Sequence, residues 1–197
     1  MSGLLRAYNS ALIRRPYAAG AASAAVLFGA GDILTQQAIE KRGRNHDVRH
    51  SHTTLNPHST GRLALYGGVI FAPIVTRWYA MLETIKMSSR AGLVMTRVGL
   101  DQFALTPVMV PVFFSSMALM EGQGVNGAKK RVESSWWSTL QRNWAVFIPV
   151  QVLNFAIVPA HLRIVLVNCV SLFWNAYLSY ANSKAGPARE KVKELMQ

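Results

Sequence analysis

Long apolar stretches separated by short basic blocks dominate this sequence and restrict what it can fold into. Only 15% of its residues are charged, yet the net charge is +12. Soluble domains carry about 25% charged residues. Here the basic residues gather in blocks such as 41–44 and 129–131, and the stretches between the blocks hold few charges. Charge confined to the connections is typical of a multi-pass membrane protein. No nucleic-acid-binding motif accompanies the basic blocks, so direct nucleic-acid binding is not expected.

We expect an all-α fold, a multi-pass membrane helix bundle of four to five spans. The expected spans cover residues 17–39, 62–82, 91–119 and, as a pair, 144–181. The last stretch is too long for one crossing of a hydrocarbon core about 30 Å thick and just long enough for two. Pro159, His161 and Arg163 lie midway along it. Because proline disfavours helix in the preceding residue and arginine favours the membrane surface, we predict a tight hairpin with Arg163 at that surface.

Two amphipathic segments are expected to lie at the membrane surface. Apolar residues recur at helical spacing in residues 4–12, which predicts an N-terminal interfacial helix. The first 17 residues also hold three arginines and no acid, a composition shared with mitochondrial transit peptides. Before the hairpin, residues 132–144 place apolar and tryptophan side chains four apart, which predicts a second interfacial helix. Trp136 and Trp137 are interpreted as interface anchors.

The whole chain, residues 1–197, is expected to form a single integral membrane domain. It includes a histidine-rich loop insertion at 40–61 and a basic tail at 182–197. His46 and His50 are four apart, a spacing that suits a metal ion in a helix, but turn-forming residues in the same segment predict a loop. No acidic or cysteine ligand set completes a site there, so we expect neither a metal site nor a cofactor.

Catalytic motifs are absent from the sequence. There is no glycine-rich phosphate loop, no nucleophile motif and no histidine–carboxylate metal pattern, so the protein is not expected to be an enzyme. Cys169 is the only cysteine, which rules out an intrachain disulfide. Since it lies in an apolar stretch, we expect a packed thiol.

Polar residues recur at helical spacing inside nearly every span, where they are costly unless they face other helices or water. Arg97 and Asp101 are four apart and are predicted to pair along one helix. The helix containing Pro149 is predicted to be bent, with its polar side wet and facing the bundle interior. The polar rows either hold helices together or line a water-containing pathway. The candidate interior residues are Asp32, Gln36, Arg97, Asp101, Gln102, Gln151, Asn154, Asn168 and Asn175.

The C-terminal part carries a distinctive pattern of spaced residues. An Asn-Trp pair at 143–144 is followed by Gln151, Asn154-Phe155 and, from residue 174, the run WNAYLS. This pattern resembles the signature of the small peroxisomal and mitochondrial inner-membrane protein family, and in particular its stress-inducible mitochondrial branch. One departure is Phe147-Ile148 where the family usually has Trp-Pro. The motif residues are Trp78, Tyr79, Asn143, Phe155, Pro159, Arg163 and Trp174.

The resemblance implies a multi-pass protein of the mitochondrial inner membrane that is not an enzyme. It implies a weakly selective channel for small solutes or metabolites, which supports stress response and, indirectly, mitochondrial DNA maintenance. The implied partners are the lipid bilayer and these solutes, and assembly as a homo-oligomer stays open. Two alternatives also stay open: a structural membrane protein whose polar residues only hold helices together, and a peroxisomal membrane channel.

Overall fold

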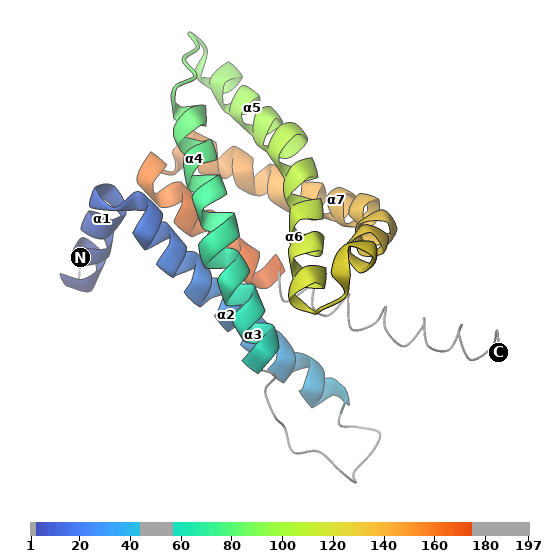
Figure 1. Ribbon diagram of the computed structural model, residues 1–197. Coiled ribbons are helices and arrows are strands. Elements are labelled where there is room, and N and C mark those ends of the chain that lie inside the picture. The colour runs from blue at the N-terminus through green and yellow to red at the C-terminus, as the bar shows by residue number, and fades with distance from the viewer. Residues whose placement is uncertain (1–2, 44–56, 175–197) are drawn as a thin grey trace, which may run out of the picture.

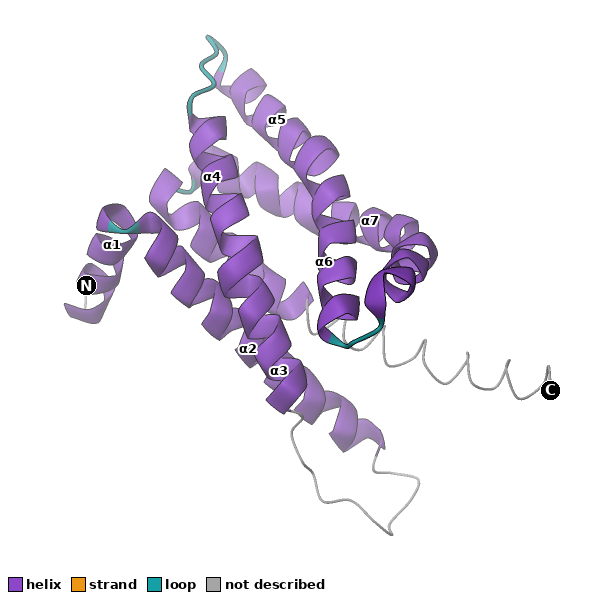
Figure 2. Ribbon diagram, in the orientation of Figure 1, coloured by secondary structure: helices purple, strands orange, loops and turns teal. Residues whose placement is uncertain are grey.

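The computed structural model describes residues 3–43 and 57–174, and every regular element in these residues is helical (Figures 1 and 2). The main helices are α1 (Gly3–Arg14), α2 (Pro16–Gly43), α3 (Pro57–Leu65), α4 (Ala72–Glu83), α5 (Arg90–Leu100), α6 (Thr106–Met120) and α7 (Gly124–Ile157). An apolar helix, Ala160–Trp174, closes the described part of the chain and begins with a 3₁₀ turn, η3 (Ala160–Leu162). The predicted all-α bundle is confirmed.

Two long rods form the centre of the bundle, each made of two helices joined without a break. A π-helical turn, η1 (Tyr66–Phe71), joins α3 to α4, and another, η2 (Asp101–Leu105), joins α5 to α6. Helix α2 packs along the first rod and α7 packs against the second (Figure 1). Three segments are long and apolar enough to cross a membrane: Pro16–Leu34, Pro57–Glu83 and Arg90–Met120.

Prolines account for the position of both π turns. Pro73 and Pro107 each follow a π turn by two residues and lack the N–H that a helix needs. Just before each proline the backbone bonds widen: the N–H of Ala72 bonds to Gly67 O and that of Thr106 to Asp101 O, five residues back. Such a turn relieves the clash between a proline ring and the preceding turn without ending the helix.

The predicted hairpin is confirmed. Helix α7 ends at Ile157, and Val158 and Pro159 adopt extended backbone before η3 begins. The separate interfacial helix before the hairpin was not found, because α7 runs unbroken for 34 residues through Pro149. No glycine or other proline occurs between residues 128 and 157, so nothing in the sequence stops this helix before the hairpin.

The predicted loop at 40–61 is shorter than expected at both ends. Helix α2 continues to Gly43, and α3 begins at Pro57, so Ser59, Thr60 and Gly61 are helical. Pro57 suits the first position of a helix, where its missing N–H costs nothing. His46, His50 and His52 lie outside the described residues, and the residues that are described contain no cluster of three metal-ligating side chains.

Small residues let the first rod approach α2 closely. A Cβ added to Gly67 would lie 2.8 Å from Cγ of Phe28 and 3.1 Å from the backbone oxygen of Ala24. Any larger residue at 67 would therefore push α2 and the rod apart. Large apolar side chains such as Val69, Phe103 and Phe173 are exposed on the outside of the bundle, as expected of surfaces that face lipid. Cys169 is also exposed, so the prediction of a packed thiol was wrong.

We expect five membrane crossings, the two hairpin helices adding to the three long segments. The N- and C-termini should then lie on opposite sides of the membrane, with most basic residues on one side. Epitope tags placed at each terminus in turn, followed by protease treatment of sealed vesicles, measure this directly. The tag on one terminus should be cleaved only after the vesicles are opened. Both tags cleaved in intact vesicles would contradict five crossings.

Candidate functional site

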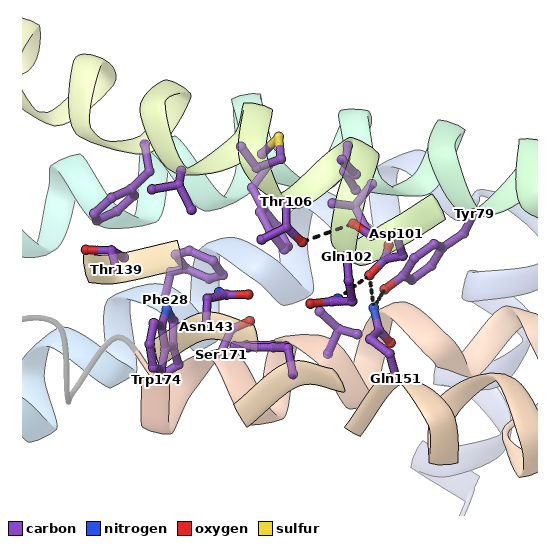
Figure 3. A pocket seen from close by; sticks show the side chains of 18 of the residues that line it. Phe28, Tyr79, Asp101, Gln102, Thr106, Thr139, Asn143, Gln151, Ser171 and Trp174 are labelled. Carbon is purple, nitrogen blue, oxygen red and sulfur yellow. Dashed lines mark hydrogen bonds between the residues drawn. The ribbon is translucent and has the colours of Figure 1, made fainter. Parts of the chain in front are cut away.

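A polar network centred on Asp101 joins three elements inside the bundle. Asp101 lies in η2 and is 3% exposed. Its Oδ1 accepts a hydrogen bond from Trp78 Nε1 of α4 at 3.2 Å. Its Oδ2 accepts from Gln102 Nε2 at 2.7 Å and from Gln151 Nε2 of α7 at 2.6 Å (Figure 3). Hydrogen bonds from N–H donors to a carboxylate are strong because they are charge-assisted. Asp101 therefore links α4 and α7 to the second rod.

Gln151 and Asn154 extend this network along α7. Gln151 Nε2 also bonds to the hydroxyl of Tyr79 at 2.7 Å, and its Oε1 accepts from Asn154 Nδ2 at 2.8 Å. Both amides are buried and face the bundle interior. Their donors do not serve the carbonyl freed by Pro149 but point to other helices and to each other. The carboxylate of Asp101 is the stronger acceptor, which explains why Gln151 turns toward it.

The predicted pair between Arg97 and Asp101 does not form. Arg97 Nη1 lies 3.0 Å from Oε1 of Glu83 instead, and Nη2 lies 3.4 Å from the backbone oxygens of Glu83 and Ile85. Arg97 leans toward the end of α4, where unpaired carbonyls attract a cation.

Arg163 joins the same cluster, which we call the Glu83 ion cluster (Glu83, Arg97 and Arg163). Its Nη1 bonds to Oε1 of Glu83, and its Nε donates to Val158 O at 3.1 Å. Its guanidinium also lies 5.1 Å from the ring centre of Phe155. The side chain is 9% exposed, so it is buried within the protein, and its expected position at the level of the membrane surface stays a prediction. The carboxylate of Glu83 makes burial tolerable by holding two arginines at the hairpin turn.

A cavity of about 110 Å³ lies beside the Asp101 network. Roughly 10–15 Å³ of such space holds one water, so several waters or a small solute fit. Asp101, Gln102 and Gln151 lie at one end, and Thr139, Asn143 and Ser171 lie toward the other (Figure 3). The Oε1 atom of Gln102 is buried without a hydrogen-bond partner. The other lining residues are Phe28, Tyr66, Phe71, Val75, Tyr79, Leu105, Thr106, Met109, Val110, Phe113, Phe147, Val167 and Trp174.

The remaining interior candidates lie elsewhere. Asp32 forms a separate clasp between α2 and α3, in which it accepts hydrogen bonds from Gln36, Ser59 and Thr60. Asn168 is fully buried, and neither atom of its amide has a partner in the described part of the chain. Asn175 lies outside the described residues.

The motif residues occupy three places. Trp78 and Tyr79 belong to the Asp101 network, and Asn143 and Trp174 line the cavity. Phe155 packs edge-on against Tyr79, with ring centres 5.6 Å apart. Pro159 starts the hairpin turn, and Arg163 belongs to the Glu83 ion cluster.

Two groups of residues at these sites were not predicted from the sequence. Thr139 and Phe147 line the cavity together with Asn143 and Gln151, all at intervals of four residues along α7. This spacing is visible in the sequence, but the apolar and tryptophan residues of 132–144 predict a helix at the membrane surface instead. Glu83 was also missed, although it is the only acid between Asp47 and Asp101.

Two tryptophans of α7 donate hydrogen bonds to backbone carbonyls of the second rod. A nearby proline leaves each of these carbonyls without an N–H partner in its own helix. Thr106 N–H bonds to Asp101 O and Pro107 has no N–H, so the carbonyl of Gln102 is free; Trp144 Nε1 bonds to it at 2.8 Å. Pro111 likewise frees the carbonyl of Pro107, to which Trp136 Nε1 bonds at 3.1 Å. Trp136 is therefore directed into the α6–α7 contact, whereas Trp137 is 56% exposed, and its role as an interface anchor stays a prediction.

Trp144→Phe should destabilise the protein because it leaves the carbonyl of Gln102 unpaired away from water. An unsatisfied buried backbone group costs about 1–3 kcal/mol. Thermal unfolding in detergent measures the loss. Trp137→Phe is the matched control, and we expect a change below about 0.5 kcal/mol at this exposed position. Equal losses in both variants would show that the bond from Trp144 contributes nothing.

Comparison with known proteins gave consistent matches. The profile of the Mpv17 / PMP22 family matches residues 118–179. The chain is 42% identical to Protein SYM1 of Gibberella zeae over 188 residues, covering 93% of this chain and all of that protein. It is 37% identical to Protein SYM1 of Saccharomyces cerevisiae, covering 92% of this chain and 91% of the relative. No solved structure matches the chain.

Proposed function

The chain belongs to the Mpv17/PMP22 family of membrane proteins, and from this premise we propose that it forms a weakly selective channel for small solutes or metabolites. The observation that carries the proposal is the cavity beside Asp101, which lies among three membrane-length segments, α7 and the last helix and is lined in part by hydroxyl, amide and carboxylate groups. If these polar groups only joined helices, we would expect them to bond to one another and to leave no space for several waters between them.

A second function is supported by the same network. Asp101 accepts three hydrogen bonds, and Gln151 bonds to three different residues. Interhelical bonds of this kind are worth about 0.6–2 kcal/mol each in membranes. A structural membrane protein without a pore would need the same contacts. The two functions differ in whether the cavity is wet and conducts.

We place this channel in the mitochondrial inner membrane, with a peroxisomal membrane as the alternative. The arginine-rich, acid-free N-terminus supports the mitochondrial location. Stress response and mitochondrial DNA maintenance would then depend on metabolite supply, with no direct contact to nucleic acid, no cofactor and no enzymatic step. Protease protection of the protein in mitochondria stripped of their outer membrane, compared with purified peroxisomes, tests the location.

The channel function is tested by reconstituting the purified protein in planar bilayers and measuring conductance and solute flux. We expect discrete conductance steps from the natural protein. Gln151→Leu combined with Asn154→Leu should insert normally but lose flux, because it removes polar groups from the interior face of α7. Gln36→Leu is the matched control, since Gln36 belongs to the α2–α3 clasp and not to the cavity. A double variant with full flux would overturn the pathway.

Cysteine accessibility checks the same expectation independently of conductance. In a background lacking Cys169, single cysteines at 143, 151 and 171 should react with small water-soluble thiol reagents. A cysteine at 153 should not react, because Leu153 is exposed on the outside of α7, where we place lipid. If the three interior positions are inert while a loop position such as 122 reacts, the interior is dry and the polar residues only hold helices together.

A further inference from the structure

Seven aromatic side chains line the cavity, and four of them form one cluster. The ring centre of Phe28 lies 6.0 Å from that of Tyr66 and 5.1 Å from that of Phe71, and Tyr66 and Phe113 are 5.2 Å apart. A second pair, Phe147 and Trp174, meets edge to face at 5.9 Å. These six residues border the cavity together with Tyr79. Ring faces carry negative potential and attract organic cations.

The only acidic residue that borders the cavity has no cationic partner in the described part of the chain. The basic residue four positions before Asp101, Arg97, is held by the Glu83 ion cluster. Both oxygens of Asp101 accept N–H bonds, the arrangement of an ionised carboxylate. A carboxylate offers about four lone-pair sites, and three N–H donors leave one of them open. An unpaired negative charge inside a membrane bundle is costly, and a bound cation would offset that cost.

A second hydrogen-bond acceptor without a donor lies beside this carboxylate. Gln102 is 1% exposed, and its Oε1 has no hydrogen-bond partner. Its amide nitrogen is turned to Asp101, which leaves the oxygen pointing into the cavity, toward Asn143 (Figure 3). Buried acceptors are nearly always satisfied, so an unpaired one that faces a cavity marks a place for a ligand N–H or O–H.

We propose that the cavity binds a small protonated primary amine, with its ammonium group between Asp101 and Gln102 Oε1 and its alkyl chain along the aromatic rings. An ammonium group supplies both the positive charge that Asp101 lacks and N–H donors for the glutamine oxygen. A quaternary ammonium supplies the charge alone, a neutral alcohol supplies the donor alone, and an anion is repelled. This assignment rests on the proposed channel function and names the class of solute that the cavity recognises.

The test is calorimetric titration of the purified protein in detergent with n-butylammonium, tetramethylammonium, butan-1-ol and butyrate. We expect n-butylammonium to bind at least about tenfold more tightly than butan-1-ol, with tetramethylammonium between them and butyrate weakest. This comparison uses the natural protein and needs no variant to fold. Equal affinity for n-butylammonium and butan-1-ol would overturn the proposal.

Variants identify the site. Asp101→Asn should reduce the affinity for n-butylammonium to about that of the alcohol, and Trp174→Leu should weaken it less, since it removes one ring of seven. Asp32→Asn is the matched control: Asp32 is equally buried and accepts three hydrogen bonds, but it does not border the cavity. Tight amine binding that survives Asp101→Asn places the ligand elsewhere and overturns the proposal.

Bilayer recordings separate this inference from the channel function. Amine binding in detergent without any conductance would support the inference and reject the channel. Conductance without preference for n-butylammonium over butan-1-ol in the titration would support the channel and reject the inference.

Discussion

Asp101→Asn should change the ion preference of the reconstituted protein while leaving it folded. The side chain keeps its shape but loses the negative charge that Asp101 places beside the cavity. Charges a few ångströms apart in a partly buried site interact by several kcal/mol, so the ratio of cation to anion permeability should change by about threefold or more. Reversal potentials measured under a salt gradient in planar bilayers report this ratio.

Asp32→Asn again serves as the control for this experiment. Both aspartates are buried and accept three hydrogen bonds, so both substitutions should lower stability by a similar amount, about 1–2 kcal/mol. Only Asp101→Asn should also change ion preference. If the two variants differ from the natural protein in stability alone, the Asp101 network holds helices together and conducts nothing.

Glu83→Gln should cause a large loss of stability because it leaves two buried arginines without a counter-charge. Arg97 and Arg163 share one oxygen of Glu83, and their side chains are 8% and 9% exposed. Removing one partner of a fully buried pair costs about 3–5 kcal/mol. Because the side chain of Glu83 is 37% exposed, solvent screens part of this effect, and we expect roughly 2–3 kcal/mol. Thermal unfolding in detergent gives the difference.

The same substitution at an exposed ion pair provides the comparison. Glu133 lies 3.9 Å from Lys129 on α7, with side chains 63% and 75% exposed. Glu133→Gln should have little effect, because exposed pairs one helical turn apart contribute only a few tenths of a kcal/mol. A Glu83→Gln variant as stable as Glu133→Gln would show that the helix C-termini alone compensate both arginines. The loss of stability in Glu83→Gln should depend only weakly on salt concentration, because burial limits the screening of these charges.

The hairpin shows how far local chemistry can predict this fold. Pro159 lacks a backbone N–H and disfavours helix in the residue before it, and Arg163 follows four residues later. Together these features predict a turn, whereas Pro149 alone does not interrupt α7. The turn was therefore predictable, and α7 indeed ends at Ile157. The burial of Arg163 was not, because it depends on Glu83, which is 80 residues away along the chain.

The pairing of Arg97 shows the opposite situation. Spacing along one helix favours a bond to Asp101, and nothing local argues against it. The structure places the end of α4 beside Arg97. The carboxylate and backbone carbonyl of Glu83 and the carbonyl of Ile85 therefore bind Arg97 in place of Asp101. Trp136 and Trp144 are a similar case: the prolines that free the carbonyls are visible in the sequence, but the donors come from the next helix.

The sequence by itself determined the helices, their apolar outer surfaces and the polar rows along them, because helical periodicity and proline chemistry act over a few residues. The tertiary structure alone decided which polar residues meet. Gln151 reaches Asp101 across 50 residues and Tyr79 across 72, and these contacts depend on where α7 crosses the two rods. Crossing positions follow from how whole helix surfaces interlock, which no local pattern encodes. The cavity exists for the same reason: Thr139 and Asn143 come to lie near Ser171 and Trp174 only once α7 has folded back on the last helix.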